Sequence, residues 1–177
     1  MRSLFAPALL LCSPPRASRS CLGSAHCSAV EGALPHAPGT HGSHILLDFV
    51  GFDHDDAHRT GEWVLKTINN AVDDHGVRRV HSKLVILGQN GESPPGFTAV
   101  TLLDESHVTA HCYSERGWLA IDVFTCGAHD PCPLARDIRD SVLAYSPGAT
   151  CVNNRRVGRF HMQDGPVAQP RLQTHCF

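Results

Sequence analysis

Residues 102–127 contain most of the side chains in this chain that could carry out acid–base or nucleophilic chemistry. The segment LLDESHVTAHCYSERGWLAIDVFTCG holds hydroxyl, imidazole, carboxylate and thiol groups close together along the chain. A hydroxyl or a thiol can act as a nucleophile, and an imidazole or a carboxylate can transfer protons. This density indicates a catalytic segment, and the simpler alternative is a solvated polar surface. The candidate residues are Asp104, Glu105, Ser106, His107, His111, Glu115 and Cys126.

The pattern of the same segment predicts two β-strands joined by a turn. Residues 107–113 alternate between polar and small apolar side chains, which is the period of a half-buried strand. His107, Thr109 and His111 therefore share one face of the predicted strand. Residues 118–124 alternate again after a Ser-Glu-Arg-Gly turn. We expect one surface of the sheet to be rich in hydroxyl and imidazole groups.

The other elements follow from apolar periodicity and from capping residues. Asp55 or Asp56 fits the N-cap of a helix and Gly76 its C-cap, with apolar residues four positions apart between them. The order β-α-β-β-β-β-α-β predicts an α+β fold, a two-layer α/β sandwich with an antiparallel-rich sheet and two helices on one face. The other face would be uncovered, so we expect dimerisation through or beside the sheet. The expected strands are residues 44–51, 77–87, 97–103, 107–113, 118–124 and 150–160, and the expected helices are residues 54–76 and 130–145.

The N-terminal part of the chain differs in composition from the rest. It contains Arg2, Arg16 and Arg19, many Ser and Ala residues, and no acidic residue before Glu31. This composition is typical of a transit peptide and predicts import into a plastid or another organelle. The short apolar run near the start also fits a secretory signal, and a disordered leader would leave the protein cytoplasmic. We divide the chain into a leader and linker at residues 1–40, a domain at residues 41–160 and a loose C-terminal tail at residues 161–177.

Charge and hydropathy exclude two classes of partner. The formal net charge of -2 offers no electrostatic attraction to nucleic acid or to an anionic membrane surface. No apolar run approaches the roughly 20 residues that a membrane-spanning helix needs. We expect a small-molecule substrate as partner, and neither nucleic acid nor a membrane.

The 8 cysteines and 13 histidines show no pattern of a metal site or a disulfide scaffold. No Cys-x-x-Cys pair occurs, and half of the cysteines lie near the chain ends. A domain of this length can be stable without disulfides, so we expect neither a disulfide framework nor a zinc site. His54 and His58 lie four positions apart with acidic residues between them. They could bind a metal, but the start of a polar helix explains them more simply, and we expect no metal.

Three familiar catalytic patterns are missing around the candidate residues. Ser106 has no flanking glycine, whereas the serine of an α/β-hydrolase stands in a Gly-x-Ser-x-Gly turn. Cys126 and His111 could form a thiol–imidazole pair, but no protease signature surrounds them. The GQNG loop lacks the lysine of a phosphate-binding loop.

The motifs ESHVTAH at residues 105–111 and FTCG at residues 124–127 resemble the bacterial-type S-adenosylmethionine decarboxylase proenzyme family. The resemblance runs from about His41 to Phe160. It implies a self-processing enzyme that converts S-adenosylmethionine to decarboxylated S-adenosylmethionine (S-adenosylmethioninamine) and carbon dioxide. Such a reaction serves spermidine and polyamine biosynthesis.

The resemblance also implies how the chain would process itself. Cleavage would fall between Glu105 and Ser106, and Ser106 would become a covalent pyruvoyl cofactor. Thr98 matches the hydroxyl residue that supports processing. His111 matches the proton acceptor, and we expect it one strand step away from Ser106.

For turnover, the resemblance implies a pyruvoyl ketone that forms a Schiff base with the substrate amine. Cys126 matches the family's proton donor, and Glu115 matches the carboxylate that binds the ribose. The ESPPG segment has no counterpart of the family's adenine-stacking aromatic residue, so Phe49 or Phe97 is the candidate ring. The role of His107, beside the pyruvoyl position, stays open.

Two other functions are compatible with the same residues. A pyruvoyl-dependent ornithine or arginine decarboxylase would use the same chemistry, with Glu92, Glu115 or Asp122 facing the distal cation of a smaller substrate. A non-catalytic regulatory relative would bind a catalytic partner. Such a relative would tend to lose the processing residues and the proton donor, and all of these are present.

Many members of the family that this chain resembles place the active site between subunits. We therefore expect a homodimer of cleaved, two-chain protomers. Residues of the first strand, such as Asp48 and Phe49, would then belong to the partner's site.

Overall fold

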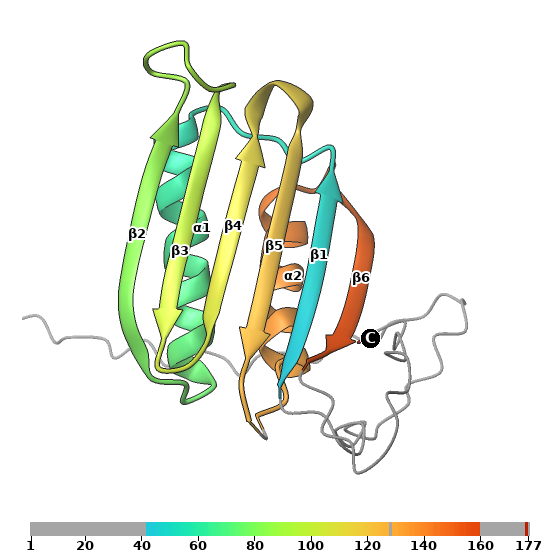
Figure 1. Ribbon diagram of the computed structural model, residues 1–177. Coiled ribbons are helices and arrows are strands. Elements are labelled where there is room, and N and C mark those ends of the chain that lie inside the picture. The colour runs from blue at the N-terminus through green and yellow to red at the C-terminus, as the bar shows by residue number, and fades with distance from the viewer. Residues whose placement is uncertain (1–41, 128, 160–175, 177) are drawn as a thin grey trace, which may run out of the picture. The chain divides into compact units, whose positions relative to one another are not determined.

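The computed structural model describes residues 42–127, 129–159 and 176. They form one antiparallel sheet of 6 strands in the order β2-β3-β4-β5-β1-β6, with both helices on one face (Figure 1). The predicted order of elements and the two-layer α+β fold are confirmed, and one short 3-10 turn is an addition. The elements are β1 (Ser43–Val50), α1 (Ala57–Asp74), β2 (Arg79–Leu87), β3 (Gly96–Leu103), β4 (His107–Tyr113), η1 (Ser114–Arg116), β5 (Trp118–Thr125), α2 (Cys132–Tyr145) and β6 (Thr150–Gly158).

Helix α1 begins after its predicted N-cap and ends within one residue of the position that its predicted C-cap indicates. The Asp56 carboxylate accepts a hydrogen bond from the Arg59 backbone N–H at 2.7 Å, which satisfies one of the free donors at the helix start. His75 is the C-cap, and Gly76 follows with a φ of +66°. Glycine adopts this left-handed conformation without strain, so Gly76 ends the helix, although the cap itself lies one residue earlier than predicted.

The hydrophobic core lies between the two helices and the sheet face that they cover. Along β4, Val108, Ala110 and Cys112 are buried, while the residues between them are partly exposed, as their alternation predicts. The helices contribute fully buried side chains to the same core, among them Ile68 of α1 and Ile138 of α2. Burial of one face therefore sets the side to which every strand residue points.

The opposite sheet face, which we call the open face, has neither helix against it (Figure 1). Large apolar side chains on this face are exposed, including Val85 at 42%, Leu102 at 43%, Tyr113 at 48% and Trp118 at 44%. An exposed apolar surface of this kind is typical of an interaction site. The predicted dimerisation through the sheet stays a prediction.

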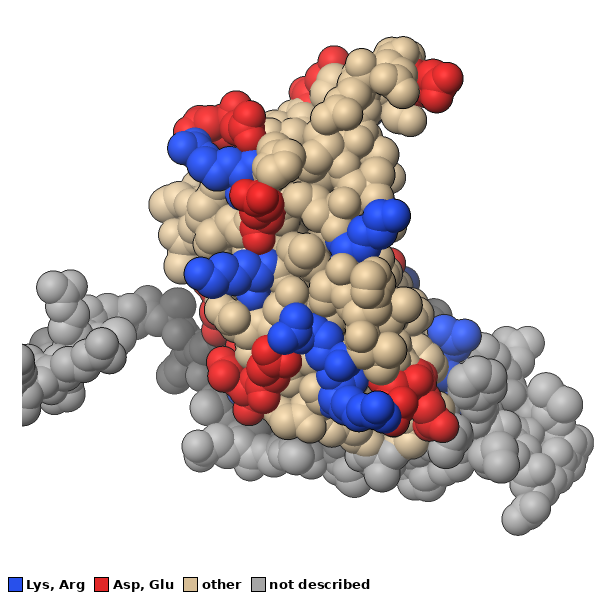
Figure 2. Space-filling model, turned by 90° about the vertical axis from the view of Figure 1, so that its left-hand side faces the viewer, with Lys and Arg blue, Asp and Glu red and all other residues tan. Residues whose placement is uncertain are grey.

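The β2 edge of the sheet carries paired charges. Arg79 lies 2.9 Å from Asp73, and Arg78 lies 3.2 Å from Asp104. Figure 2 shows this side of the molecule, where side chains of both signs are interspersed. Charged side chains on an edge strand disfavour edge-to-edge pairing with other sheets.

The predicted leader at residues 1–40 lies outside the described residues, as does the predicted tail except for Cys176. Among the described residues, no helix is long and apolar enough to cross a bilayer.

A disulfide joins Cys176 to Cys132, the first residue of α2, with the two Cα atoms 5.7 Å apart. We expected no disulfide framework, and this bond between Cys132 and Cys176 is one disulfide that the sequence did not predict. The partners are 44 positions apart in the chain. Sequence reasoning failed here because such a pair meets only when the fold brings the chain end to α2.

Candidate active site

Ser106 stands at the junction of a tight turn and strand β4. The Leu103 backbone N–H donates to the Ser106 carbonyl oxygen at 3.0 Å, which closes the turn between β3 and β4. Asp104 and Glu105 form its exposed tip. The peptide bond between Glu105 and Ser106 therefore lies where the turn enters the sheet.

Antiparallel pairing brings Cys126 to Ser106. His107 lies opposite Phe124, so Ser106 lies near the end of β5, where Cys126 follows the strand. The Cys126 backbone N–H donates to Ser106 Oγ at 2.9 Å. This bond orients the hydroxyl oxygen in the uncleaved chain.

A cavity of about 280 Å³ lies beneath this turn, between the α1–β2 connection and the loop after β5. Glu105, Ser106 and Cys126 all line the cavity, so the groups around the Glu105–Ser106 bond have free space on this side. Sequence analysis did not place His75, Arg78 and His129 near Ser106, because they lie far from it along the chain. The lining includes Glu105, Ser106 and Cys126 together with His75, Arg78 and His129.

Thr98 and His111 form a second polar group, on the open face. They lie directly opposite each other on β3 and β4, and a hydrogen bond joins Thr98 Oγ1 and His111 Nδ1 at 2.9 Å. Both side chains are partly exposed. The hydrogen bond restricts the orientation of the imidazole ring on this face.

His111 does not lie beside Ser106 of its own chain. The two residues are five positions apart on an extended strand, which at about 3.3 Å per residue places their Cα atoms roughly 16 Å apart. A hydrogen bond spans only about 3 Å between heavy atoms, and these two side chains are too short to bridge the rest. The expectation that His111 lies one strand step from Ser106 is therefore wrong, because the separation is most of the length of β4.

Glu115 lies in η1, past the end of β4 that is farther from Ser106, and its side chain is exposed. Two aromatic rings flank it on the open face, Tyr113 and Trp118, with ring centroids 6.4 Å apart. The Arg116 guanidinium lies 4.9 Å from the centroid of the Trp118 ring. Sequence analysis missed these rings, although the alternation of β4 places Tyr113 on the same face as His111.

Phe49 and Phe97 do not reach either polar group. Their side chains are 1% and 0% exposed and lie in the core beneath the helices. The alternation of β1 puts Phe49 on the helix-covered face with its neighbours Ile45 and Leu47. The assignment of Phe49 to substrate binding is therefore not supported, because a ring in the core offers no surface to a ligand.

His107 lies on the open face next to Ser106, within a group of rings. Its ring centroid is 6.0 Å from that of His44 and 5.5 Å from that of Phe124. His44 Nε2 also lies 3.7 Å from Asp122 Oδ1. Burial lowers the pKa of His44, and the Asp122 carboxylate offsets this effect only in part. Asp122, a candidate for binding a distal cation, accepts a hydrogen bond from Thr109 Oγ1 at 3.5 Å.

The part of the chain that the structure describes contains no group of three His, Cys, Asp or Glu side chains that could hold a metal ion. His58 Nδ1 instead lies 3.5 Å from Glu62 Oε1, one turn further along α1.

The comparisons with known proteins agree with this fold. The family model described as S-adenosylmethionine decarboxylase matches residues 43–146, from the first residue of β1 to the residue after α2. The matched segment contains both polar groups, the one around Ser106 and the one around His111. The chain belongs to the S-adenosylmethionine decarboxylase family.

Individual relatives support the assignment. The S-adenosylmethionine decarboxylase proenzyme of Parasynechococcus marenigrum is 34% identical over 100 residues, covering 54% of this chain and 73% of that protein. The proenzyme of Bacillus velezensis is 34% identical over 107 residues, covering 59% of this chain and 79% of that protein. The crystal structure of the adenosylmethionine decarboxylase from Aquifex aeolicus aligns with a TM-score of 0.53 and 26% identity, covering 73% of this chain and 98% of that one.

The site predicts different reactivity for two cysteines. Burial raises the pKa of the Cys112 thiol to about 11, so at about pH 8 this thiol is protonated, whereas Cys126 is partly exposed. We expect iodoacetamide to label Cys126 in the folded protein and Cys112 only after unfolding, as measured by peptide mass mapping. Equal labelling of both thiols in the folded protein would contradict the burial of Cys112.

Proposed function

We propose that this protein is a self-processing, pyruvoyl-dependent decarboxylase that converts S-adenosylmethionine to S-adenosylmethioninamine and carbon dioxide for spermidine and polyamine biosynthesis. The observation that carries the proposal is the position of Ser106. Its hydroxyl lies at a turn junction, next to the bond that it would cleave, and the Cys126 N–H holds its oxygen at 2.9 Å. Family membership supplies the reaction class.

Processing would begin when Ser106 Oγ attacks the Glu105 carbonyl carbon, which breaks the amide C–N bond and forms an ester. Loss of the Cα proton of residue 106 would then break the Cβ–O bond and release Glu105 as the carboxyl end of one chain. The dehydroalanine left on the other chain would tautomerise, take up water and release ammonia. A pyruvoyl group would remain at the new N-terminus.

The sheet order explains how the protein would survive this cut. β1 belongs to the segment before Glu105, but it pairs with β5 and β6, which both follow Ser106. The two segments also share β3–β4 pairing and the core. Both products would therefore stay in one folded unit.

The residues around position 106 fit a pyruvoyl group, because the precursor serine is present and a cavity adjoins it. The group supplies a ketone that condenses with the substrate amine and withdraws electrons as carbon dioxide leaves. Cys126 would return the proton to the substrate carbon, since its backbone already contacts residue 106. Removal of such a proton donor typically costs about 10²–10⁴-fold in rate.

The second polar group would act in a homodimer of cleaved, two-chain protomers. Because Thr98 and His111 lie roughly 16 Å from Ser106 of their own chain, they would serve a partner's Ser106 if a second copy packs on the open face. The exposed apolar side chains of that face would supply the contact. His111 would then accept the Cα proton of the partner's Ser106, and Thr98 would orient the His111 ring.

Substrate binding would use the exposed residues at the same end of the open face. The Glu115 carboxylate can accept hydrogen bonds from both ribose hydroxyls. Tyr113 and Trp118 flank it and present ring surface on which an adenine base could stack. Organelle import of the protein, to a plastid or elsewhere, is also part of the proposal, and it rests only on the composition of residues 1–40.

Cleavage can be tested with a Ser106→Ala variant. We expect the wild-type protein to yield two fragments on a denaturing gel, with an intact mass that gives a pyruvoyl group at position 106. The variant should stay a single chain, because it lacks the attacking oxygen. A single unsplit wild-type band would favour the non-catalytic relative.

A shared active site predicts complementation between two defective chains. Ser106→Ala and His111→Ala variants should each remain uncleaved alone. When they are co-expressed with different tags, the His111→Ala chain should be cleaved, because its Ser106 would meet His111 of the Ser106→Ala partner. Absence of cleavage in a mixed dimer verified by tag capture would place both residues in one protomer's site.

The substrate can be assigned by competition between three candidates. We expect the processed protein to release carbon dioxide from carboxyl-labelled S-adenosylmethionine and not from labelled ornithine or arginine. Glu115→Gln should raise KM with a smaller change in kcat, because the carboxylate binds the ribose and not the reacting carbon. If the protein turns over only ornithine or arginine, that amino acid would be its substrate in place of S-adenosylmethionine. The proposed processing chemistry would still hold.

A further inference from the structure

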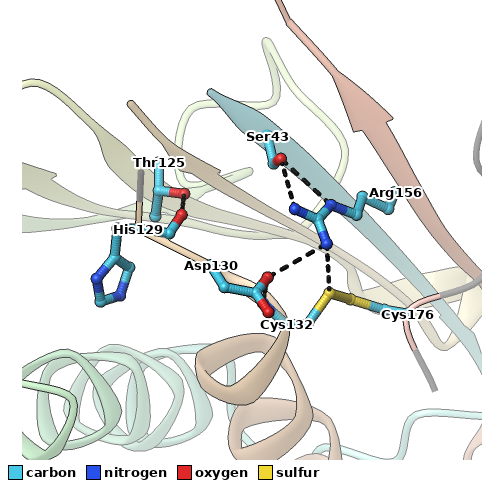
Figure 3. Close-up of a disulfide and its surroundings, with 7 residues drawn as sticks. All are labelled: Ser43, Thr125, His129, Asp130, Cys132, Arg156 and Cys176. Carbon is cyan, nitrogen blue, oxygen red and sulfur yellow. Dashed lines mark hydrogen bonds and ion pairs between the residues drawn. A yellow bond between two sulfur atoms is a disulfide. The ribbon is translucent and has the colours of Figure 1, made fainter. Parts of the chain in front are cut away.

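The two sulfur atoms of the disulfide between Cys132 and Cys176 lie in different environments (Figure 3). Cys132 is 6% exposed and occupies the first position of α2. Cys176 is partly exposed. An attacking thiol therefore has better access to the sulfur of Cys176.

A buried cation lies against the sulfur of Cys132. Arg156, on β6, is 2% exposed, and its Nη1 atom lies 3.8 Å from Cys132 Sγ. Other atoms of the guanidinium donate to Ser43 Oγ at 3.0 and 3.2 Å. Figure 3 shows the guanidinium between the hydroxyl of Ser43 on one side and the sulfur on the other. The contacts of the guanidinium with Ser43 and Asp130 do not involve the disulfide.

The first turn of α2 adds to this positive environment. Cys132 begins a helix of 14 residues, and the free N–H groups of a helix start favour a negative charge. Asp130 disfavours a negative charge at Cys132, because its own carboxylate is negatively charged. This carboxylate lies 3.3 Å from Arg156 and accepts the Cys132 N–H at 3.2 Å. One carboxylate thus faces one guanidinium, and the helix start tips the balance toward stabilising a thiolate at Cys132.

We propose that Cys132–Cys176 is an exchangeable, redox-active disulfide in which Cys132 is the leaving thiolate. A thiolate of a reduced dithiol protein would attack Cys176 Sγ and form a mixed disulfide with Cys176, while the S–S bond breaks and the electron pair stays on Cys132. The second thiol of the dithiol would then resolve the mixed disulfide. Cys176 would leave as a thiol, and the dithiol would end oxidised.

The surroundings favour each part of this exchange. A thiolate that is stabilised leaves faster and makes its disulfide easier to reduce. Cys132 would gain Arg156 as a counter-ion, and the chain end at Cys176 would be freed from α2. The inference goes beyond the proposed function and does not depend on it.

The exchange is tested on the full-length protein in buffers of reduced and oxidised glutathione. After acid quenching and alkylation, peptide mapping would give the reduced fraction at Cys132 and Cys176. We expect reduction to be half complete at a less reducing glutathione ratio in Asp130→Asn than in wild type, because the opposing carboxylate is gone. The double variant Asp130→Asn with Arg156→Met should need a more reducing ratio than Asp130→Asn alone, because the thiolate of Cys132 then lacks the guanidinium as counter-ion.

A second measurement tests Cys132 without the disulfide. In Cys176→Ser, the alkylation rate of Cys132 should reach half its maximum below about pH 7.5, whereas an ordinary thiol titrates near 8.5. Cys151 is the internal control, because burial raises the pKa of its thiol. The proposal fails if Cys132 titrates with or above Cys151, if the wild-type disulfide resists millimolar reduced glutathione, or if both cysteines are thiols in protein kept free of reductant.

Discussion

The position of β1 between β5 and β6 is the constraint on which the proposed chemistry depends. The first half of the chain supplies the strand, and the second half supplies both of its neighbours. Their backbone hydrogen bonds and the shared core join the halves without need of the link at Glu105 and Ser106. If this bond at the β3–β4 turn is cut as proposed, these contacts would still join the two products.

The length of strand β4 keeps the two groups of candidate catalytic residues apart. Ser106 and Cys126 meet at one end, and Thr98, His111 and the residues around Glu115 lie toward the other. An extended strand cannot bend these groups together. The open face on which the second group lies is also the face with exposed apolar side chains. In the proposed homodimer, this one surface would serve both for contact with a second copy and for completion of the site.

The helix layer contributes more than a cover for the core. The start of α2 follows the loop that holds Cys126, and the buried guanidinium of Arg156 connects this helix start to β1 and β6. The disulfide to Cys176 is attached at the same point. The loop between β5 and α2 thus carries both Cys126, which contacts Ser106, and Asp130, which contacts Arg156 beside the disulfide.

The sequence by itself determined the local features of this protein. The alternation along residues 107–113, the caps Asp56 and Gly76, and the family motifs around Ser106 depend only on neighbouring residues, and they predicted the elements, their faces and the enzyme class. Only the tertiary structure decided that Phe49 is buried, that His111 is remote from Ser106 and that Cys132 meets Cys176. Each of these depends on which face the helices cover, or on how an extended chain turns sequence spacing into distance. Such relations arise from packing between segments far apart in the chain, and spacing along the chain does not contain them.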